Sequence, residues 1–505
     1  MPAHLPDSVD VLVVGGGING VGIARDAAGR GLSVLLVERG DLGCATSSAS
    51  SKLIHGGLRY LEHFEFRLVA EALAEREVLL AAAPHIVHPM RFVMPHVPEL
   101  RPAWMIRAGL LLYDYLARRQ TLPASQAIDL RHSVFGAGLK NGVSRAFLYS
   151  DCRVDDARLV VLTARAASDL GAKVLTRTTC STARRDGKRW RATLRFADGA
   201  QSEVAARALV NATGPWAKRF LVDALRMQTP FNLKLVQGSH IVVPKLYEGD
   251  HAYILQNDDR RVIFVYGYED HYTLIGTTEV EVSGSPESCA VSEHEMDYLV
   301  RAANRYFDRE LSLDDVVWSY CGIRPLFDDG STNPSAISRD YELRIDGDST
   351  EAPVLTVFGG KITTYRRLAE QALEKLAPWF RDLAPTWTAR VALPGGDLAE
   401  GLAGYVDRLS LRYPELPRPI LVSLARRHGT LTSQVLESVR TVAQLGEHFG
   451  AELYAREVEH FVRREWARTA EDVLWRRTKA GLHIPPEHRQ TLAHLIAELI
   501  SAPVR

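Results

Sequence analysis

The sequence lacks the features that would assign it at once to several broad classes of protein. Its 505 residues include five cysteines, which lie far apart with no C-x-x-C or other metal-ligand spacing. Lys and Arg total 61, as do Asp and Glu, so no net charge attracts nucleic acid or a membrane surface. The N-terminal segment is neither basic nor apolar, and no uncharged run approaches the ~20 residues that cross a bilayer. These absences predict reduced cysteines, a cytoplasmic protein without a membrane span, no metal site and no nucleic-acid partner.

The opening stretch carries the clearest pattern in the chain. Residues 9–14 are apolar and mostly β-branched except for Asp10, as in a strand buried on both faces. Gly15, Gly17 and Gly20 follow at G-x-G-x-x-G spacing. The first glycine permits a sharp turn, the second lets a pyrophosphate approach the backbone, and the third lets the next helix pack close to the sheet.

The residues after these glycines complete one βαβ unit. Helix formers occupy 21–30, Gly31 ends the helix, and residues 33–37 indicate a second strand. Glu38 follows that strand, 18 residues after the third glycine, near the position of the carboxylate that binds the ribose of a dinucleotide. This order predicts a dinucleotide-binding domain rather than a glycine-rich turn of another α/β fold: a strand, the three glycines, a helix, a second strand and an acidic residue.

Later segments predict a second domain and a helical end. Short β runs between 231 and 282 are typical of a mostly antiparallel sheet inserted between pieces of the first domain. We expect a discontinuous dinucleotide-binding domain (1–85, 150–230 and 320–385), a substrate-binding cap (86–149 and 231–319) and a helical C-terminal domain (390–505).

Some local segments are predicted individually. Helical patterns cover 66–83 and 155–170, and residues 316–327 are expected to form a strand followed by a loop. The prolines between 89 and 102 argue against regular structure there. Residues 104–119 combine an apolar run with arginines, which favours a buried helix, with a helix at a membrane interface as the alternative.

Several stretches together resemble one known family, the FAD-dependent glycerol-3-phosphate dehydrogenases, and most closely their bacterial aerobic, respiratory type. The resemblance covers essentially the whole chain. The Ser-rich loop joined to HGGLRYLEH and the later GGKITTYR are its most specific parts. In order, the matching stretches are VVGGGINGVGIARDAAGRGLSVLLVE, ATSSASSKLIHGGLRYLEH, LVNATGPW, QGSHIVV, IGTTE, GIRPL and FGGKITTYR.

The resemblance implies a reaction, a fold and a location. The reaction is oxidation of sn-glycerol 3-phosphate to dihydroxyacetone phosphate by hydride transfer to FAD, with electrons passed to a membrane quinone. The fold is a glutathione-reductase-like FAD-binding domain with an inserted antiparallel-sheet substrate domain and an all-α C-terminal domain. The protein would be a homodimer attached peripherally to the inner, cytoplasmic face of the cell membrane. Gly267 and Glu279 depart mildly from the family pattern, in which proline and aspartate are more usual.

A phosphorylated substrate needs cations beside the reacting carbon. Arg59, Arg324 and Lys361 are the candidates, because each stands beside or near glycine in a stretch that matches a family motif. An arginine fork grips two phosphate oxygens, whereas lysine supplies a movable point charge. Arg324 and Lys361 are also expected to act in catalysis, and Tyr60 could donate a hydroxyl hydrogen bond to the substrate.

The candidate base is His240, in the QGSHIVV motif. Neutral imidazole, with an ordinary pKa near 6.5, can accept the proton of the substrate hydroxyl at physiological pH. His55 is the competing candidate, although the His-Gly-Gly sequence also suits a backbone role near the flavin.

The expected FAD contacts come from several parts of the chain. Gly15, Gly17 and Gly20 are expected to face the pyrophosphate, and Glu38 the adenosine ribose. The helix start at 359–361 could stabilise negative charge on the flavin. The complete predicted set is Gly15, Gly17, Asn19, Gly20, Glu38, Thr46, Ser47, Ser48, Ala212, Gly214, Gly359, Gly360, Lys361 and Thr363.

Other functions remain open from the residues alone. They are a glycerol-3-phosphate oxidase that delivers electrons to oxygen, a related amine oxidase acting on N-methyl amino acids, an NAD-dependent dehydrogenase, and a flavin-bound membrane adaptor without turnover. The amine oxidase does not need several cations for a phosphate. The second glycine-rich elements at 213–214 and 359–361 favour the longer FAD over NAD.

Overall fold

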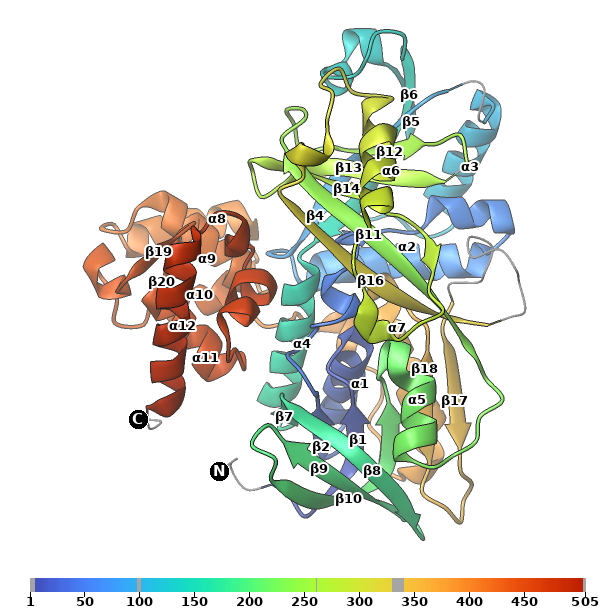
Figure 1. Cartoon of the computed structure of the whole chain (residues 1–505), viewed down its shortest axis with the longest axis vertical. Helices are drawn as coiled ribbons and strands as arrows, with labels where there is room; N and C mark the ends of the chain where they lie inside the picture. Colours follow the sequence, from blue (N-terminus) through green and yellow to red (C-terminus); the bar gives the residue numbers. More distant parts are fainter. Residues whose placement is uncertain (1–4, 98–100, 260, 329–339, 503–505) are drawn as a thin grey trace.

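The computed structural model describes residues 5–97, 101–259, 261–328 and 340–502. Figure 1 shows a dinucleotide-binding part at the bottom, a cap above it, and a separate helical C-terminal domain on one side. This arrangement confirms the predicted fold class of an α/β domain with an inserted sheet and a helical end.

The first sheet contains the predicted βαβ unit. In β1, Val11 and Val13 pack against the helices of one face, whereas Leu12 and Val14 belong to the core on the other, which explains the near-continuous apolar run. Strands β2 and β10 both pair with β1 in parallel. In sheet order the strands are β17 (Glu342–Asp346), β18 (Val354–Phe358), β10 (Gln201–Asn211), β1 (Ser8–Val14), β2 (Val34–Val37) and β7 (Lys173–Leu175), with β8 (Thr178–Asp186) and β9 (Arg189–Phe196) attached through β10.

Strand β10 serves two pairings at once. Residues Gln201 to Ala206 pair antiparallel with β9 and form a hairpin with it. The same strand continues to Asn211 and pairs in parallel with β1 and β18. One strand therefore joins the hairpin with β9 to the parallel part of the sheet.

Helices cover one face of this sheet. α1 (Ile18–Gly29) packs against both α4 (Asp156–Asp169) and α7 (Tyr365–Leu376), and all three contribute to one core cluster. Figure 1 shows α1 and α4 side by side. The side chain of Asp155 caps α4 by accepting from the N–H of Arg158.

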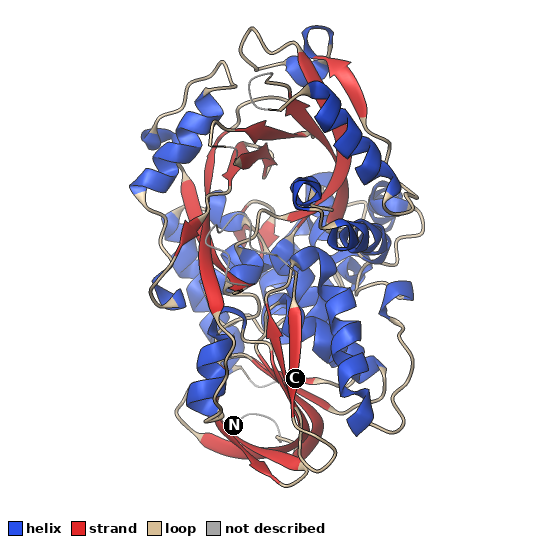
Figure 2. Ribbon diagram, turned by 90° about the vertical axis from the view of Figure 1, so that its right-hand side faces the viewer, coloured by secondary structure: helices blue, strands red, loops and turns tan. Residues whose placement is uncertain are grey.

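The cap is a large, mostly antiparallel sheet that curves around its own core, as Figure 2 shows. α6 (Glu293–Asn304) covers part of it, and Ser292 and Glu295 form its capping box. Among the described residues its strands run in the order β15 (Val280–Glu281), β11 (Leu233–Pro244), β14 (Tyr272–Gly276), β13 (Val262–Tyr268), β12 (Ala252–Gln256), β4 (Val87–Pro95), β6 (Arg145–Val154) and β3 (Leu53–Ile54), with β16 (Trp318–Phe327) on β11 and β5 (Gln126–Asp129) on β6.

Two segments of the cap differ from the sequence prediction. β16 is a strand over its whole length and pairs with β11 from Trp318 to Phe327, so no loop begins within it. β4 is a regular strand despite Pro89 and Pro95, because β12 pairs with it only at Phe92 and Val93. The prolines thus lie where β4 has no second neighbour, and no ladder hydrogen bond is lost on that side.

Helix α3 (Ala103–Tyr115) is not the fully buried helix that its composition favoured. Ile106, Leu110 and Tyr113 are buried in the cap core, but Trp104 is 73% exposed and Tyr115 is 79% exposed. The inward and outward residues alternate at helical spacing. The run is apolar because the helix has one apolar face toward the core and another toward solvent.

The C-terminal domain is helical, as predicted, with one small two-stranded sheet, β19 (His448–Gly450) and β20 (Leu453–Tyr454). Val458, Phe461 and Val462 pack inside it. Its helices are α8 (Gly401–Arg412), α9 (Arg418–His428), α10 (Thr432–Val435), α11 (Ala455–Arg464) and α12 (Pro486–Ser501), and α2 (Phe66–Ala82) and the short α5 (Ala217–Arg219) complete the helices of the other parts.

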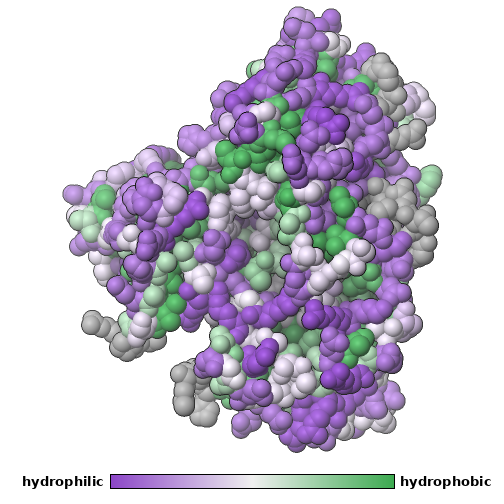
Figure 3. Space-filling view, viewed as in Figure 1, coloured by the Kyte–Doolittle hydropathy of each residue, from purple (hydrophilic) through white to green (hydrophobic). Residues whose placement is uncertain are grey.

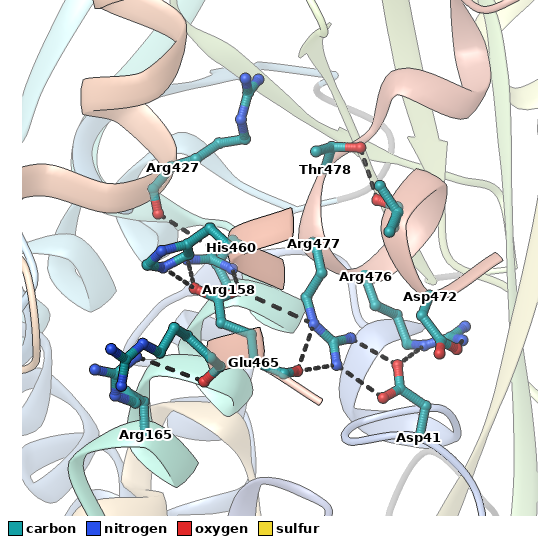
Figure 4. A network of polar contacts seen from close by, with 12 residues as sticks. Asp41, Arg158, Arg165, Arg427, His460, Glu465, Asp472, Arg476, Arg477 and Thr478 are labelled. Carbon is teal, nitrogen blue, oxygen red and sulfur yellow. Dashed lines mark hydrogen bonds and ion pairs between the residues drawn. The ribbon is translucent and has the colours of Figure 1, made fainter. Parts of the chain in front are cut away.

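A buried ion network joins the C-terminal domain to the dinucleotide-binding part, as Figure 4 shows. Arg477 contacts both carboxylate oxygens of Asp41, at 2.6 and 2.8 Å. Arg158 of α4 binds the carboxylate of Glu465 with two nitrogens. Asp41, Arg158, Glu465 and Arg477 are all buried, so desolvated charge pairs are part of what holds the two parts together.

The prediction that the cysteines stay reduced is wrong for one pair. Cys289 and Cys321 form a disulfide across 32 residues of sequence. Their pairing follows from the fold, because Cys321 lies in β16 and the loop before α6 returns to the same edge of the cap sheet. Cys44, Cys152 and Cys180 are free thiols.

Candidate active site

One cavity of about 1160 Å³ lies where the three parts of the molecule meet. Its walls include Gly15 and Glu38 of the first domain, His240 and Arg324 of the cap, and Trp475 of the C-terminal domain. Trp475 stacks on Trp318 of β16 at a centroid distance of 4.4 Å. In Figure 3 the face of the molecule is hollowed between these parts.

The N-terminus of α1 forms one wall. Gly17 is the N-cap residue, and the N–H of Ile18 donates to Oγ of Ser47 at 3.0 Å. Gly15 adopts φ of +112°, and a Cβ built on Gly17 would lie 3.1 Å from the same Ser47 oxygen. An approaching pyrophosphate therefore meets bare backbone and the positive end of the helix dipole.

Gly20 does not line the cavity, in contrast to the expectation that all three glycines face the pyrophosphate. A Cβ built on Gly20 would lie 1.9 Å from the carbonyl oxygen of Gly15. Its role is close packing of α1 on the turn after β1.

Glu38 lies beside the same turn. Its carboxylate accepts hydrogen bonds of 2.7 Å from the N–H groups of Gly16 and Gly40. Burial raises the pKa of Glu38, although these two hydrogen bonds oppose the shift. The carboxyl group is thus oriented at the cavity wall, where the ribose hydroxyls of a dinucleotide would need an acceptor.

The other predicted cofactor residues line the same cavity. Asn19 donates to the carbonyl of Gly359 at 3.2 Å and so links α1 to the Gly359–Gly360 turn, in which both glycines have positive φ. Thr46 donates to the carbonyl of Ile323 at 2.6 Å, which joins its loop to β16. The remaining ones on the wall are Ser47, Ser48, Ala212, Gly214, Lys361 and Thr363. These residues present bare backbone at the glycines, hydroxyl groups and a lysine to one cavity, and such a lining fits FAD.

The three predicted cations converge on this cavity. Arg59 lies in the short helix η2 (Leu58–His63) after the Gly56–Gly57 pair, and Arg324 lies in β16. Lys361 stands at the start of η9 (Ile362–Thr364), with its Nζ 3.8 Å from the ring centroid of Tyr60. Arg59 and Tyr60 come from one segment, and Arg324 and Lys361 from two much later ones, yet all four side chains line the same cavity. Three cations on one cavity suit an anionic substrate.

A carboxylate that sequence reasoning set aside lies among these cations. Glu279 is 3.8 Å from Arg59 and 3.5 Å from Arg324, measured between the nearest nitrogen and oxygen atoms. Arg324 also donates to Oγ1 of Thr277 at 3.0 Å. The sequence signalled Glu279 only as a departure from the family pattern.

His240 is buried in the cavity wall. Its Nε2 lies 2.9 Å from Oγ of Ser51, and its ring stacks on Tyr320 with centroids 4.8 Å apart. Nδ1 has no hydrogen-bond partner among the described residues. Burial, followed by the charges of Arg324 and Lys52, lowers the pKa of His240 well below its ordinary value. The ring is therefore neutral at physiological pH.

His55 lies on the same cavity, where its ring is half-buried and tilted against Phe264 at a centroid distance of 5.9 Å. Its backbone N–H lies 3.4 Å from Oγ1 of Thr363. The structure thus brings both candidate bases to one site.

Sequence reasoning missed a polar cluster at the adenosine side of the cavity. Arg39 stacks on the ring of Trp216 at 4.1 Å, and Nε1 of Trp216 donates to Glu287 at 2.7 Å. Glu287 comes from the loop before α6, so this loop reaches from the cap to the first domain. Trp216 ends the LVNATGPW stretch, but no local pattern signals its contacts with Arg39 and Glu287, because the three residues meet only through the fold.

The one trio of described residues spaced for a metal ion is His428, His460 and Glu465, buried in the C-terminal domain. It does not line the cavity, and Glu465 is already bound by Arg158.

Comparison with known proteins identifies the family. Residues 10–366 match the family model of FAD dependent oxidoreductases, and residues 386–502 match that of the C-terminal domain of alpha-glycerophosphate oxidase. The chain is 55% identical over 494 residues to a glycerol-3-phosphate dehydrogenase of Pseudomonas aeruginosa, covering 98% of this chain and 96% of that protein. It is 48% identical over 486 residues to a D-erythritol 1-phosphate dehydrogenase of Brucella abortus, covering 96% and 97%.

A solved structure shows the same fold over nearly the whole chain. The crystal structure of a Bacillus halodurans glycerol-3-phosphate dehydrogenase complexed with FAD aligns with a TM-score of 0.76 at 26% identity, covering 98% of this chain and 89% of that one. The chain therefore belongs to the FAD dependent oxidoreductase family, in the group that includes the bacterial glycerol-3-phosphate dehydrogenases.

Proposed function

We propose that the protein oxidises sn-glycerol 3-phosphate to dihydroxyacetone phosphate with FAD as cofactor. The observation that carries the proposal is that Arg59, Arg324 and Lys361 line the same cavity as the glycines of the dinucleotide site. The 55% identity to a named glycerol-3-phosphate dehydrogenase over nearly the whole chain supports it.

The reaction removes a hydride from the carbinol carbon and a proton from its hydroxyl group. When bound, FAD supplies the hydride acceptor. Arg59, Arg324 and Lys361 hold the phosphate, with Tyr60 beside them, so that the carbinol carbon is fixed within about 3–3.5 Å of its acceptor. Arg324 and Lys361 also keep positive charge next to the oxygen as it loses its proton.

His240 takes the hydroxyl proton in this proposal. It is neutral, lies on the cavity wall, and is held by Ser51 and Tyr320. His55 is the rival, since it reaches the same cavity with a less buried ring.

A longer polyol phosphate is the second candidate substrate. The 48% identical relative from Brucella abortus is named a D-erythritol 1-phosphate dehydrogenase, and its substrate has the same phosphate and secondary alcohol chemistry. The phosphate-holding residues would act alike on both compounds, and relative kcat/KM separates them.

The electron acceptor in this proposal is a membrane quinone, and the protein is a homodimer that binds the inner face of the cell membrane peripherally. In the part of the chain that the structure describes, no helix has the length and apolar character of a membrane span. The outward face of α3, formed by Trp104, Met105, Leu111, Leu112 and Tyr115, supports interfacial binding instead. Arg118 is exposed at the end of this helix, where anionic headgroups would meet it.

The position of α3 links this face to the active site. Tyr113 on its inner side accepts a hydrogen bond of 2.8 Å from the N–H of Gly56, next to the segment that carries Arg59. A bilayer at the α3 face would therefore lie close to the cavity wall from which a quinone could draw electrons.

Anaerobic absorbance spectroscopy of the purified protein tests the proposed reaction. The flavin band at about 450 nm should bleach on addition of sn-glycerol 3-phosphate and stay unchanged with sarcosine. Under air, turnover with a quinone analogue and without stoichiometric peroxide distinguishes the dehydrogenase from an oxidase. Colourless protein, or yellow protein that glycerol 3-phosphate does not bleach, would overturn the proposal.

A further inference from the structure

The candidate base, His240, is almost completely enclosed by protein. The residue is 1% exposed, and its Nδ1 is buried with no hydrogen-bond partner among the described residues. Tyr320 stacks on the ring, and a Cβ built on Gly276 would lie 2.0 Å from Cδ2. The other nitrogen, Nε2, lies 2.9 Å from Oγ of Ser51. A substrate hydroxyl group that approaches Nε2 therefore meets Ser51 first.

Ser51 connects this nitrogen with the cavity. The residue is half-buried and lines the same cavity as Arg59 and Arg324. A serine hydroxyl group has one hydrogen and two lone pairs, so Oγ can donate to Nε2 and still accept a hydrogen bond from a second hydroxyl group. Within the described part of the chain, His240 is the one hydrogen-bond partner of this Oγ. Its acceptor capacity is thus left for a ligand.

The candidate phosphate site adjoins this pair. Gly238 and His240 lie on the same side of β11, because side chains alternate along a strand. Nη2 of Arg324 lies over Gly238, 2.4 Å from the position that a Cβ would take. In glycerol 3-phosphate the secondary alcohol carbon is bonded to the carbon that carries the phosphate. A phosphate held by Arg324 therefore brings that hydroxyl group close to Ser51 and His240.

The backbone around Ser51 is held in place on both sides. Oγ of Ser50 donates to the carboxylate of Asp156 at 2.7 Å, and Nζ of Lys52 contacts the same carboxylate at 2.9 Å. Oη of Tyr266 donates to the carbonyl of Ser51 at 2.9 Å. Lys52 has φ of +53°, which a residue other than glycine keeps only where its surroundings enforce it. The position of the Ser51 hydroxyl group is therefore fixed by its neighbours.

We propose that Ser51 is a catalytic residue that passes the proton of the substrate hydroxyl group to His240, an inference that rests on the proposed function. The alcohol O–H bond breaks as its proton goes to Oγ of Ser51, and the original Ser51 proton goes to Nε2. The electron pair of the broken alcohol O–H bond forms the carbonyl group as the hydride leaves the carbinol carbon. Ser51 ends neutral and His240 ends as imidazolium. The step requires the tautomer of His240 with its proton on Nδ1.

Counting the protons that move in the wild-type, FAD-loaded protein tests the inference. Stopped-flow absorbance measures anaerobic flavin reduction by glycerol 3-phosphate in mixtures of light and heavy water. Because two exchangeable protons move, the rate should follow a curve against the deuterium fraction. Direct transfer from the substrate to His240 moves one proton and gives a straight line, which would overturn the inference.

Removal of the hydroxyl group is the second test. Ser51→Ala should slow flavin reduction about 10²-fold while FAD content and substrate affinity stay near wild type, because a proton path is lost but no phosphate contact. Ser51→Thr keeps a hydroxyl group and should recover most of the lost rate. The matched control is Ser319→Ala, which removes a hydroxyl group beside Tyr320 but outside the cavity and should behave as wild type. Reduction by Ser51→Ala at wild-type speed would overturn the inference.

Heteronuclear NMR of protein with isotope-labelled histidine gives a readout that does not depend on turnover. At neutral pH the His240 imidazole, identified by the loss of its signals in His240→Ala, should have an unprotonated Nε2 whose signal moves in Ser51→Ala. A protonated Nε2 would overturn the inference. If Ser51→Ala does not fold, the curve and the tautomer of the wild type decide. Failure of glycerol 3-phosphate to bleach the wild type would instead overturn the proposed function.

Discussion

At the scale of single residues, contacts on several sides fix the ring of His240, the candidate base. Tyr320 stacks on its ring, Ser51 fixes Nε2, and a Cβ built on Gly276 would lie 2.0 Å from the ring, so glycine is required there. A neutral imidazole fixed on three sides loses little entropy when it accepts a proton. Such pre-organisation is typical of catalytic acid–base groups.

His240→Ala should slow anaerobic flavin reduction by glycerol 3-phosphate about 10²- to 10⁴-fold while FAD stays bound, because a general base is lost but no cofactor contact. Stopped-flow absorbance measures the rate, and the 280/450 nm ratio measures FAD content. His55→Ala is the matched comparison. Full-speed reduction in the His240 variant, with a large loss in the His55 variant, would transfer the role to His55.

Individual site residues could be predicted where a local motif carries them. Gly15, Gly17 and Glu38 follow from one βαβ pattern, and all three line the cavity. Gly20 belongs to the same motif, but its role is packing, because glycine spacing alone does not tell a ligand contact from a helix contact. Tyr320 was not predicted, because its contact with His240 depends on the pairing of β11 with β16.

At the scale of elements, α3 shows where composition misleads. Trp104, Leu111, Leu112 and Tyr115 lie on one side of the helix, opposite the buried Ile106 and Leu110. A helix with one buried and one exposed apolar face has the same composition as a fully buried helix. Only the elements that pack against the helix distinguish the two cases. The order of β1, α1 and β2 could be predicted because the glycines and apolar runs that mark it are local in sequence. The pairings of β4 and β16 could not be predicted, because they depend on contacts between distant segments.

Trp104→Gln combined with Tyr115→Gln should weaken binding to vesicles with anionic lipid at least roughly tenfold, because each exposed ring contributes apolar area to the interface. Vesicle sedimentation measures the effect. Thermal stability should change by no more than about 0.5 kcal/mol, since both side chains already face solvent. The control is Leu411→Gln, at an 85% exposed position on α8. If the α3 variant bound the vesicles as well as wild type, the exposed face of α3 would be ruled out as the membrane-binding surface.

At the scale of the whole molecule, buried charge pairs hold the C-terminal domain in place. Burial alone would raise the pKa of Asp41, but the guanidinium groups of Arg477 and Arg476 outweigh burial and lower that pKa to about 2. The carboxylate therefore binds protons less readily in the folded protein than in the unfolded chain, where its pKa is near 3.9. This pair stabilises the fold above about pH 4, and that contribution is lost as the pH falls toward 2.

Asp41→Asn should lower the free energy of unfolding by about 3–5 kcal/mol at neutral pH, because the buried Arg477 loses the carboxylate that contacts it most closely. Denaturant unfolding, followed by fluorescence, measures it. The gap between variant and wild type should narrow as the pH is lowered from 4 to 2. Asp186→Asn, which breaks an exposed pair with Arg191, should cost at most about 1 kcal/mol. A variant as stable as wild type would show that the network does not hold the domain.

The cavity wall is assembled from residues as early as Val14 and as late as Arg476. During synthesis the ribosome therefore has to deliver almost the entire chain before this wall exists. A nascent chain that ends before Glu471 would lack the last residues of the cavity wall, which are Glu471, Trp475 and Arg476. The cofactor site is thus complete only after residue 476 has been synthesised, and folding of the C-terminal domain is part of its assembly.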